Sequence, residues 1–304
     1  MGAPEEVTRW GGLAASLLGA LATGCATTTP FDAEVALARH GEDVLAAMDD
    51  LETARVASIA RLGRLEELVR AAPARGDVRK MLIVGWARHG LLFIEDDVDE
   101  ARERGDGPTA SYHAMRARNA YERAVHHGRE LLGAAAFDAA AAGDTASGFL
   151  AGRAGDDPET LAWLGAAWLG RIRVAPEDRK QLGLQAHVGE ALLERSVALD
   201  PKAANGWAHL VLGLWRGRPG GDVERAKQHF DRAAEASGRR LLLVQVFLAR
   251  AVVCQAHDRE RWDALFKEVL DARDPAPELR VDNAVAKRKA ARDVNGTRRA
   301  QCVP

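Results

Sequence analysis

Few side chains in this chain have the types and spacing needed to bind a metal or activate a nucleophile. His126 and His127 are adjacent, and adjacent residues on a helix point about 100° apart, so the two imidazoles cannot share one ion unaided. No HExxH or CxxC motif accompanies them. The pair is therefore expected to lie on a surface or in a groove, and no metal site is predicted.

An acidic run, Glu95-Asp96-Asp97 with Asp99 and Glu100, could bind a cation in principle. It lacks the glycine spacing of an EF-hand loop. We expect instead a solvated acidic face opposite the Arg-rich helix over residues 116–129.

Two further motifs do not indicate an enzymatic activity. RGRPGGD at 216–222 has no GK[ST] sequence to hold phosphates and no preceding strand, so it is expected to be a turn between helices. Cys254 lies in AVVCQAH, on an apolar helix face that favours an inert buried thiol. No Ser or Cys carries the signature of activation by a His-carboxylate pair. We predict a protein that is not an enzyme and needs no cofactor.

Cys25 has the clearest chemistry. From Trp10 to Phe31 no residue is charged, and the apolar part at 10–22, WGGLAASLLGALA, has the length of a signal-peptide core. It is shorter than the roughly 20 residues of a membrane-spanning helix. The small residues ATG then precede Cys25, which resembles the lipobox of bacterial lipoproteins, whose cysteine thiol receives a diacylglyceryl group before cleavage. The alternatives are an uncleaved anchor and a hydrophobic helix with an incidental cysteine.

Composition narrows the fold and the partners. The 304 residues are 47% hydrophobic, which is enough for one large domain or two ordinary ones. The net charge of −2 gives no indication of nucleic-acid binding. Cys254 and Cys302 could form a disulfide in an oxidising periplasm or remain two buried thiols, since spacing alone cannot decide.

Apolar residues recur every three or four positions from residue 34 almost to the end, which predicts helices throughout. The expected helices lie near 34–50, 54–71, 78–95, 109–132, 158–173, 181–198, 203–215, 222–236, 241–256, 259–272 and 278–293. Proline and glycine punctuate the joints between them. The prediction is an all-α fold of about 11 paired antiparallel helices. Its parts are a signal peptide (1–24), a lipidated tether (25–33), a helical repeat domain (34–294) and a flexible tail (295–304), with an Ala- and Gly-rich connection at 134–152.

Part of this pattern resembles the tetratricopeptide repeat (TPR), so the fold is expected to be a TPR-like α-solenoid. LAWLGAAW at 161–168 fits a first helix, in which Gly165 allows close helix approach. The motif A-x-x-x-F-x-x-A of a second helix appears at Ala226, Phe230 and Ala233.

Four tryptophans, Trp163, Trp168, Trp207 and Trp215, fall on such first helices, which line the concave face of a repeat solenoid. A partner or an apolar ligand would find good anchors in them, because tryptophan buries a large area at low entropic cost. The alternative is that they pack in the core between helices.

Several features together resemble the T-component lipoproteins of TRAP transporters, often called TatT. They are the lipobox-like Cys25, the Trp-rich TLAWLGAAWLGRI, LLERSVALDP followed by GGDVERAKQHF, and the closing ELRVDNAVAKRKAARDV. The resemblance spans roughly residues 45–294. Family members carry more Phe and Tyr in the middle helices, where alanine dominates here. The resemblance implies a periplasmic, lipid-anchored scaffold that partners a TRAP solute-binding protein, with self-assembly around a central pore as a further implication.

The resulting hypothesis is a non-catalytic accessory of a TRAP-type transport system that docks a periplasmic solute-binding protein. Ala26 after the lipidated cysteine favours the outer membrane, by resemblance to lipoprotein sorting rules. One alternative is a generic TPR lipoprotein that scaffolds outer-membrane, pilus or cell-wall assembly. Another is a carrier that holds an apolar ligand between its helices.

Overall fold

The computed structural model describes residues 29–303 apart from 144, 154, 176–182 and 275. The predicted signal peptide and the lipid-attachment residue Cys25 lie outside the described residues. The described residues form helices and no strands, which confirms the all-α prediction.

The N-terminal half comprises α1 (Pro30–Ala46), α2 (Leu51–Ala71), α3 (Gly76–His89), the π-turn η1 (Gly90–Ile94), α4 (Glu95–Glu103), α5 (Gly107–Leu132), α6 (Ala134–Ala142), α7 (Ala146–Ala151) and α8 (Pro158–Val174). The C-terminal half comprises α10 (Ala186–Leu199), η2 (Ala203–Gly206), α11 (Trp207–Arg216), α12 (Val223–Ala236), α13 (Leu243–Leu248), η3 (Ala249–Val253), α14 (Cys254–Ala256), α15 (Arg259–Asp271), η4 (Pro277–Leu279), α16 (Arg280–Asn295) and α17 (Thr297–Cys302).

Aspartate side chains determine where many of these helices begin. Each accepts a hydrogen bond from the backbone N–H three residues later, which satisfies an N–H group that has no partner within the helix. The aspartates that cap a helix in this way are Asp50, Asp106, Asp157, Asp222 and Asp258. The helix starts can therefore be read locally from the sequence.

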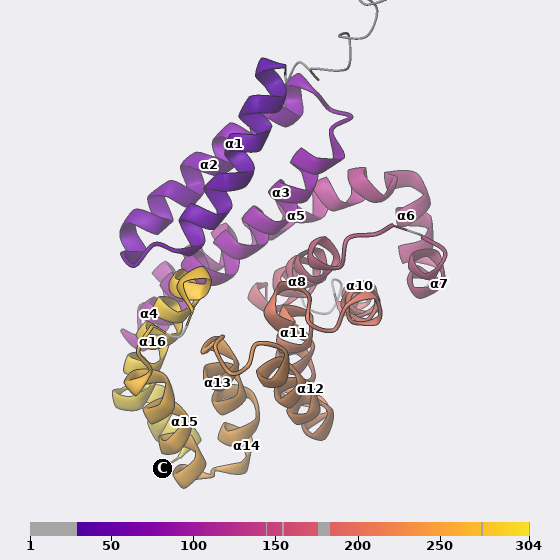
Figure 1. The fold of residues 1–304 in the computed structure, drawn as a ribbon. Coiled ribbons are helices and arrows are strands. Elements are labelled where there is room, and N and C mark those ends of the chain that lie inside the picture. Colours follow the sequence, from indigo (N-terminus) through magenta and orange to yellow (C-terminus); the bar gives the residue numbers. More distant parts are fainter. Residues whose placement is uncertain (1–28, 144, 154, 176–182, 275, 304) are drawn as a thin grey trace, which may run out of the picture.

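The helices form a curved row whose two ends meet (Figure 1). Contacts run in order from α1 to α2, α3, α5 and α8, then through α10, α11, α12 and α13 to α15 and α16. The last long helix, α16, then contacts both α1 and α2. This closure brings the C-terminal end of the chain against the N-terminal helices.

Glycines allow α8 and α10 to pack closely, as predicted for Gly165. A Cβ atom on Gly165 would lie 2.6 Å from Cγ of Leu193 and 3.0 Å from the carbonyl oxygen of Gly189. One on Gly189 would lie 2.7 Å from Leu169. A Cβ at Gly165 would thus press on the backbone of α10, and one at Gly189 would press on the Leu169 side chain of α8.

We expect Gly165→Ala to lower the free energy of unfolding by about 1–2 kcal/mol, because the new methyl group meets a backbone carbonyl that cannot rotate away. Gly63→Ala is the matched control. Gly63 lies on the exposed face of α2 and a Cβ there meets nothing within 4 Å, so this variant should gain up to about 1 kcal/mol from helix propensity. Urea unfolding followed by circular dichroism measures both. Equal changes in the two variants would contradict the close approach of α8 and α10.

Two segments differ from expectation. The connection at 134–152 contains α6 and α7, with Phe137 and Leu150 buried in the core. The tail predicted to be flexible at 295–304 contains α17, so that prediction does not hold for the described residues there. Cys302 is buried and forms a disulfide with Cys254, and this bond together with α17 fixes the tail to α14.

Candidate functional site

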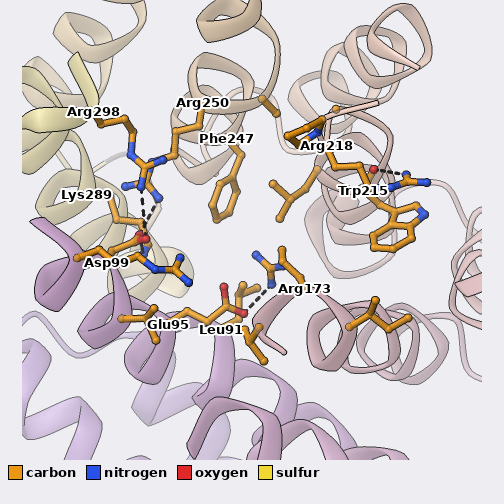
Figure 2. Close-up of a pocket in the computed structure, with 18 of the residues that line it drawn as sticks. Leu91, Glu95, Asp99, Arg173, Trp215, Arg218, Phe247, Arg250, Lys289 and Arg298 are labelled. Carbon is orange, nitrogen blue, oxygen red and sulfur yellow. Dashed lines mark hydrogen bonds and ion pairs between the residues drawn. The ribbon is translucent and has the colours of Figure 1, made fainter. Parts of the chain in front are cut away.

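A cavity of about 500 Å³ lies where the curved row of helices surrounds its own centre (Figure 2). Its walls come from η1, α4, α8, α11, α13, η3, α16 and α17. The volume falls within the range of small-molecule binding sites. Since these elements are far apart in the sequence, the cavity exists only because the two ends of the row meet.

Part of the cavity wall is apolar. It is formed by Leu91, Ile172, Leu214, Trp215 and Phe247. A second, small cavity of about 20 Å³ lies beside this wall, next to Tyr121, and shares the lining residues Leu91, Arg173, Leu214 and Trp215 with the main cavity. An apolar group of a ligand could therefore leave water on this side.

The rest of the wall is charged, and bases outnumber acids. The bases are Arg102, Arg173, Arg218, Arg250, Lys289 and Arg298, and the acids are Glu95 and Asp99. What the cavity can bind depends on which of these bases are neutralised by neighbouring carboxylates.

Glu95 is fully engaged by its neighbours. Arg173 donates a hydrogen bond from Nη2 to Oε1 of Glu95 at 2.6 Å, and the hydroxyl group of Tyr121 donates to the same oxygen. Burial and the adjacent Glu95 carboxylate raise the pKa of Tyr121 well above its ordinary value, so the phenol stays protonated. Arg173 and Glu95 therefore neutralise each other.

Asp99 is neutralised from the opposite side of the cavity. Its carboxylate lies 2.7 Å from Nη1 of Arg250 and 2.8 Å from Nζ of Lys289, with Arg298 at 3.6 Å. Burial would raise the pKa of Asp99, but the coulombic attraction of Arg250 and Lys289 outweighs it and holds the pKa well below its usual range. Arg250 and Arg298 also pair with Asp293.

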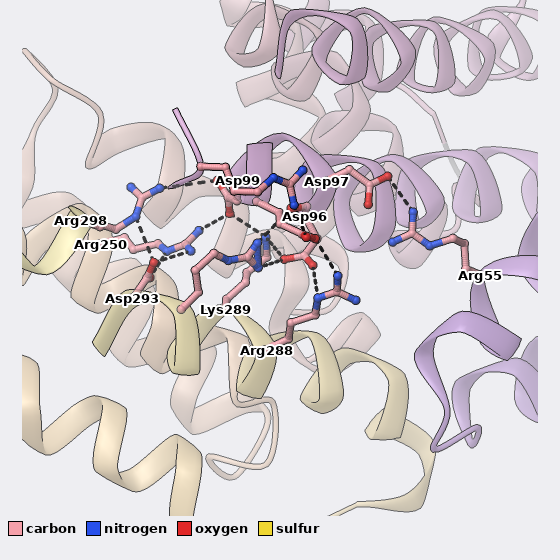
Figure 3. Close-up of polar contacts among 12 residues, drawn as sticks. Arg55, Asp96, Asp97, Asp99, Arg250, Arg288, Lys289, Asp293 and Arg298 are labelled. Atoms are coloured by element: carbon pink, nitrogen blue, oxygen red, sulfur yellow. Dashed lines mark hydrogen bonds and ion pairs between the residues drawn. The ribbon is translucent and has the colours of Figure 1, made fainter. Parts of the chain in front are cut away.

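Asp99 and Lys289 also belong to a larger ion-pair network between α4 and α16 (Figure 3). Asp96 is buried and lies 3.0 Å from Nε of Arg288 and 3.2 Å from Nζ of Lys289, and Arg292 donates to it as well. The prediction of a solvated acidic face opposite residues 116–129 was wrong. Although Arg116 lies 3.9 Å from Asp97, the three cations that pair with the buried Asp96 all come from α16, because the closure of the row brings this helix across the acidic run.

Arg218 is held at the cavity by the turn that joins α11 to α12. Because α11 ends at Arg216 and α12 begins at Val223, the prediction of a turn between helices at 216–222 is confirmed. Gly220 has a φ of 76°, and a Cβ on Gly221 would lie 2.0 Å from the carbonyl oxygen of Arg216. Arg218 donates from Nη1 to the carbonyl oxygen of Trp215 at 2.6 Å, and its guanidinium lies 4.0 Å from the centre of the Trp215 ring. Among the described residues, no carboxylate lies within ion-pair distance of Arg218.

The four predicted tryptophans do not form one surface. Trp163, Trp168, Trp207 and Trp215 are 1%, 3%, 2% and 9% exposed. The rings of Trp163 and Trp207 lie 4.6 Å apart in the core, and Trp168 donates from Nε1 to the carbonyl oxygen of Gln185. In this structure only Trp215 of the four reaches the cavity. The other three pack between helices, which was the alternative interpretation of the pattern.

The remaining candidates have structural partners. His127 is buried and its Nε2 lies 3.2 Å from Glu66, while His126 lines a shallow surface hollow. Within the described ranges, no group of three or more His, Cys, Asp or Glu side chains is placed to hold a metal ion. None of the helices in the described part of the chain combines the length and apolar character needed to cross a membrane.

Comparison with known proteins yields one match. The model of a family described as TRAP transporter T-component matches residues 47–295, which is most of the chain. A search of curated proteins gives no match.

Proposed function

Because the chain belongs to the TRAP transporter T-component family, we propose that it is a lipid-anchored periplasmic scaffold that docks the solute-binding protein of a TRAP transport system. Family membership makes it an accessory component of such a system. The family match across residues 47–295 is the observation that carries the proposal. The anchor, the compartment and the docked partner are the parts that the experiments below test.

The role that we propose is binding without catalysis. The described helices contact one another in order, the two ends of the row meet, and a cavity lies between them. The pairing of α11 with α12 supports a TPR-like scaffold, because Ala226, Phe230 and Ala233 of the A-x-x-x-F-x-x-A motif are all fully buried. TPR solenoids commonly serve as extended binding surfaces for other proteins.

A lipid on Cys25 would hold this scaffold close to a membrane. Helix α1 begins at Pro30, five residues after Cys25. Five residues span at most about 18 Å even when fully extended. A docked solute-binding protein would therefore stay near the membrane surface, where its effective concentration is raised.

The test is affinity purification of the full-length chain from native membranes after mild cross-linking. We expect a TRAP solute-binding protein to be enriched with the wild-type chain. Labelled palmitate should be incorporated into the wild type and not into Cys25→Ser, since the thiol is the acceptor. Recovery of only outer-membrane, pilus or cell-wall assembly factors would contradict the TRAP role and support the generic scaffold.

A further inference from the structure

We propose that the central cavity binds a small organic anion with an apolar body, such as a medium-chain carboxylate, and that Arg218 is its principal charge partner. This binding site belongs to the accessory chain itself. The proposal depends on the cavity and not on the docking of a partner protein.

The charges of the cavity wall are not balanced. Glu95 is neutralised by Arg173, and Asp99 is neutralised by Arg250 and Lys289. Arg298 has Asp99 and Asp293 as partners. Among the described residues, Arg218 and Arg102 are the bases of this wall without a carboxylate within 4 Å. The described part of the cavity wall therefore has an excess of positive charge, which attracts anions and repels cations.

Arg218 is held in place by Trp215. One of its N–H groups donates to the Trp215 carbonyl oxygen, and the guanidinium lies against the Trp215 indole. The indole is in turn held by a hydrogen bond of 2.8 Å from its Nε1 to Glu190. A guanidinium carries five N–H donors in a planar fork that matches a carboxylate. The unused donors of Arg218 are thus held in one orientation for a ligand.

An apolar wall lies beside this charge. Figure 2 shows Arg218 and Trp215 across the open space from Arg298 and Lys289, with Phe247 between these two sides. Leu91, Leu214 and Trp215 line both the main cavity and the small cavity beside it. A free phosphate or sulfate would leave this wall unused, whereas each methylene group buried there raises affinity about fourfold. The combination favours a carboxylate attached to a hydrocarbon body.

The experiment uses the full mature chain, purified without any partner and titrated by isothermal calorimetry. The probes are octanoate, hexanoate, 1-octanol and octylammonium. We expect saturable binding of octanoate, weaker binding of hexanoate by about 16-fold because two methylene groups are lost, and no binding of octylammonium. Equal affinity for octanol and octanoate, or no saturable binding of octanoate, would overturn the proposal.

Substitutions of Arg218 test whether this residue is the charge partner of the anion. Arg218→Gln should weaken octanoate binding at least tenfold without changing the binding of octanol. Arg218→Lys should restore part of the affinity, because it keeps the charge but loses the planar fork. Arg225→Gln is the matched control, since Arg225 is exposed on α12 outside the cavity, and it should bind octanoate as the wild type does.

Arg218 is itself exposed, so the thermal unfolding of all three variants should match the wild type. Unchanged octanoate affinity in Arg218→Gln would contradict the assignment. Since no partner protein is present, failure here leaves the docking proposal intact, and the reverse also holds.

Discussion

Replacing Asp99 with asparagine should lower the free energy of unfolding by about 3–5 kcal/mol, which is the usual loss when one partner of a buried ion pair is removed. Asp99 lies between Arg250 and Lys289, and Lys289 is almost completely buried. Without the carboxylate, positive charge is left in the interior with too few compensating acids. The loss is measured by urea unfolding at pH 7.

Asp138→Asn is the matched control for this change. Asp138 pairs with Arg129 near the surface, where the two side chains are 43% and 40% exposed, so its loss should stay under about 1 kcal/mol. The pH dependence gives a second readout. The pKa of Asp99 lies below its unfolded value, so its contribution is full above about pH 4 and is lost as the pH falls further. Asp99→Asn should therefore show a shallower loss of stability below pH 4. Equal losses in the Asp99 and Asp138 variants would contradict the role of the network.

Removing the disulfide in the double variant Cys254→Ser, Cys302→Ser should lower the free energy of unfolding by about 4 kcal/mol, because the bond closes a long loop. The two cysteines are separated by 48 residues, which include α15 and α16. The bond also fixes α17, whose Arg298 lies at the cavity. Hydrogen exchange should become faster over residues 297–303 in the variant.

Reductant is the control for this prediction. Adding dithiothreitol to the wild type should reproduce the stability of the double variant, and the same treatment should leave the variant unchanged. A wild type that unfolds at the same urea concentration with and without reductant would contradict the stabilising role of the bond.

Local features of the fold could be predicted from the sequence, because they depend on neighbouring residues. Aspartate caps and proline breaks mark the helix boundaries, and Gly165 gives the close approach of α8 and α10. The turn at 216–222 follows from its glycines in the same way. Its role in holding Arg218 does not follow, since the Trp215 indole points toward the cavity only once α11 has packed.

Long-range features could not be predicted, because the sequence pattern does not state which helices meet. The acidic run of α4 pairs with α16, about 190 residues away. Asn283 is a further case, since its side chain accepts from the backbone N–H of Leu242 and donates to the carbonyl oxygen of Arg240. The disulfide was one of two open alternatives, because spacing gives no distance between thiols.

The central claim is that this chain docks the solute-binding protein of a TRAP system, and direct binding between purified components tests it most directly. The lipidated chain is captured on a supported bilayer, and the purified solute-binding protein from the same organism is passed over it at increasing concentration. We predict saturable, reversible binding, and none to a bilayer that lacks the chain. A folded, membrane-bound chain that retains its disulfide and binds no TRAP solute-binding protein at any concentration would contradict the account.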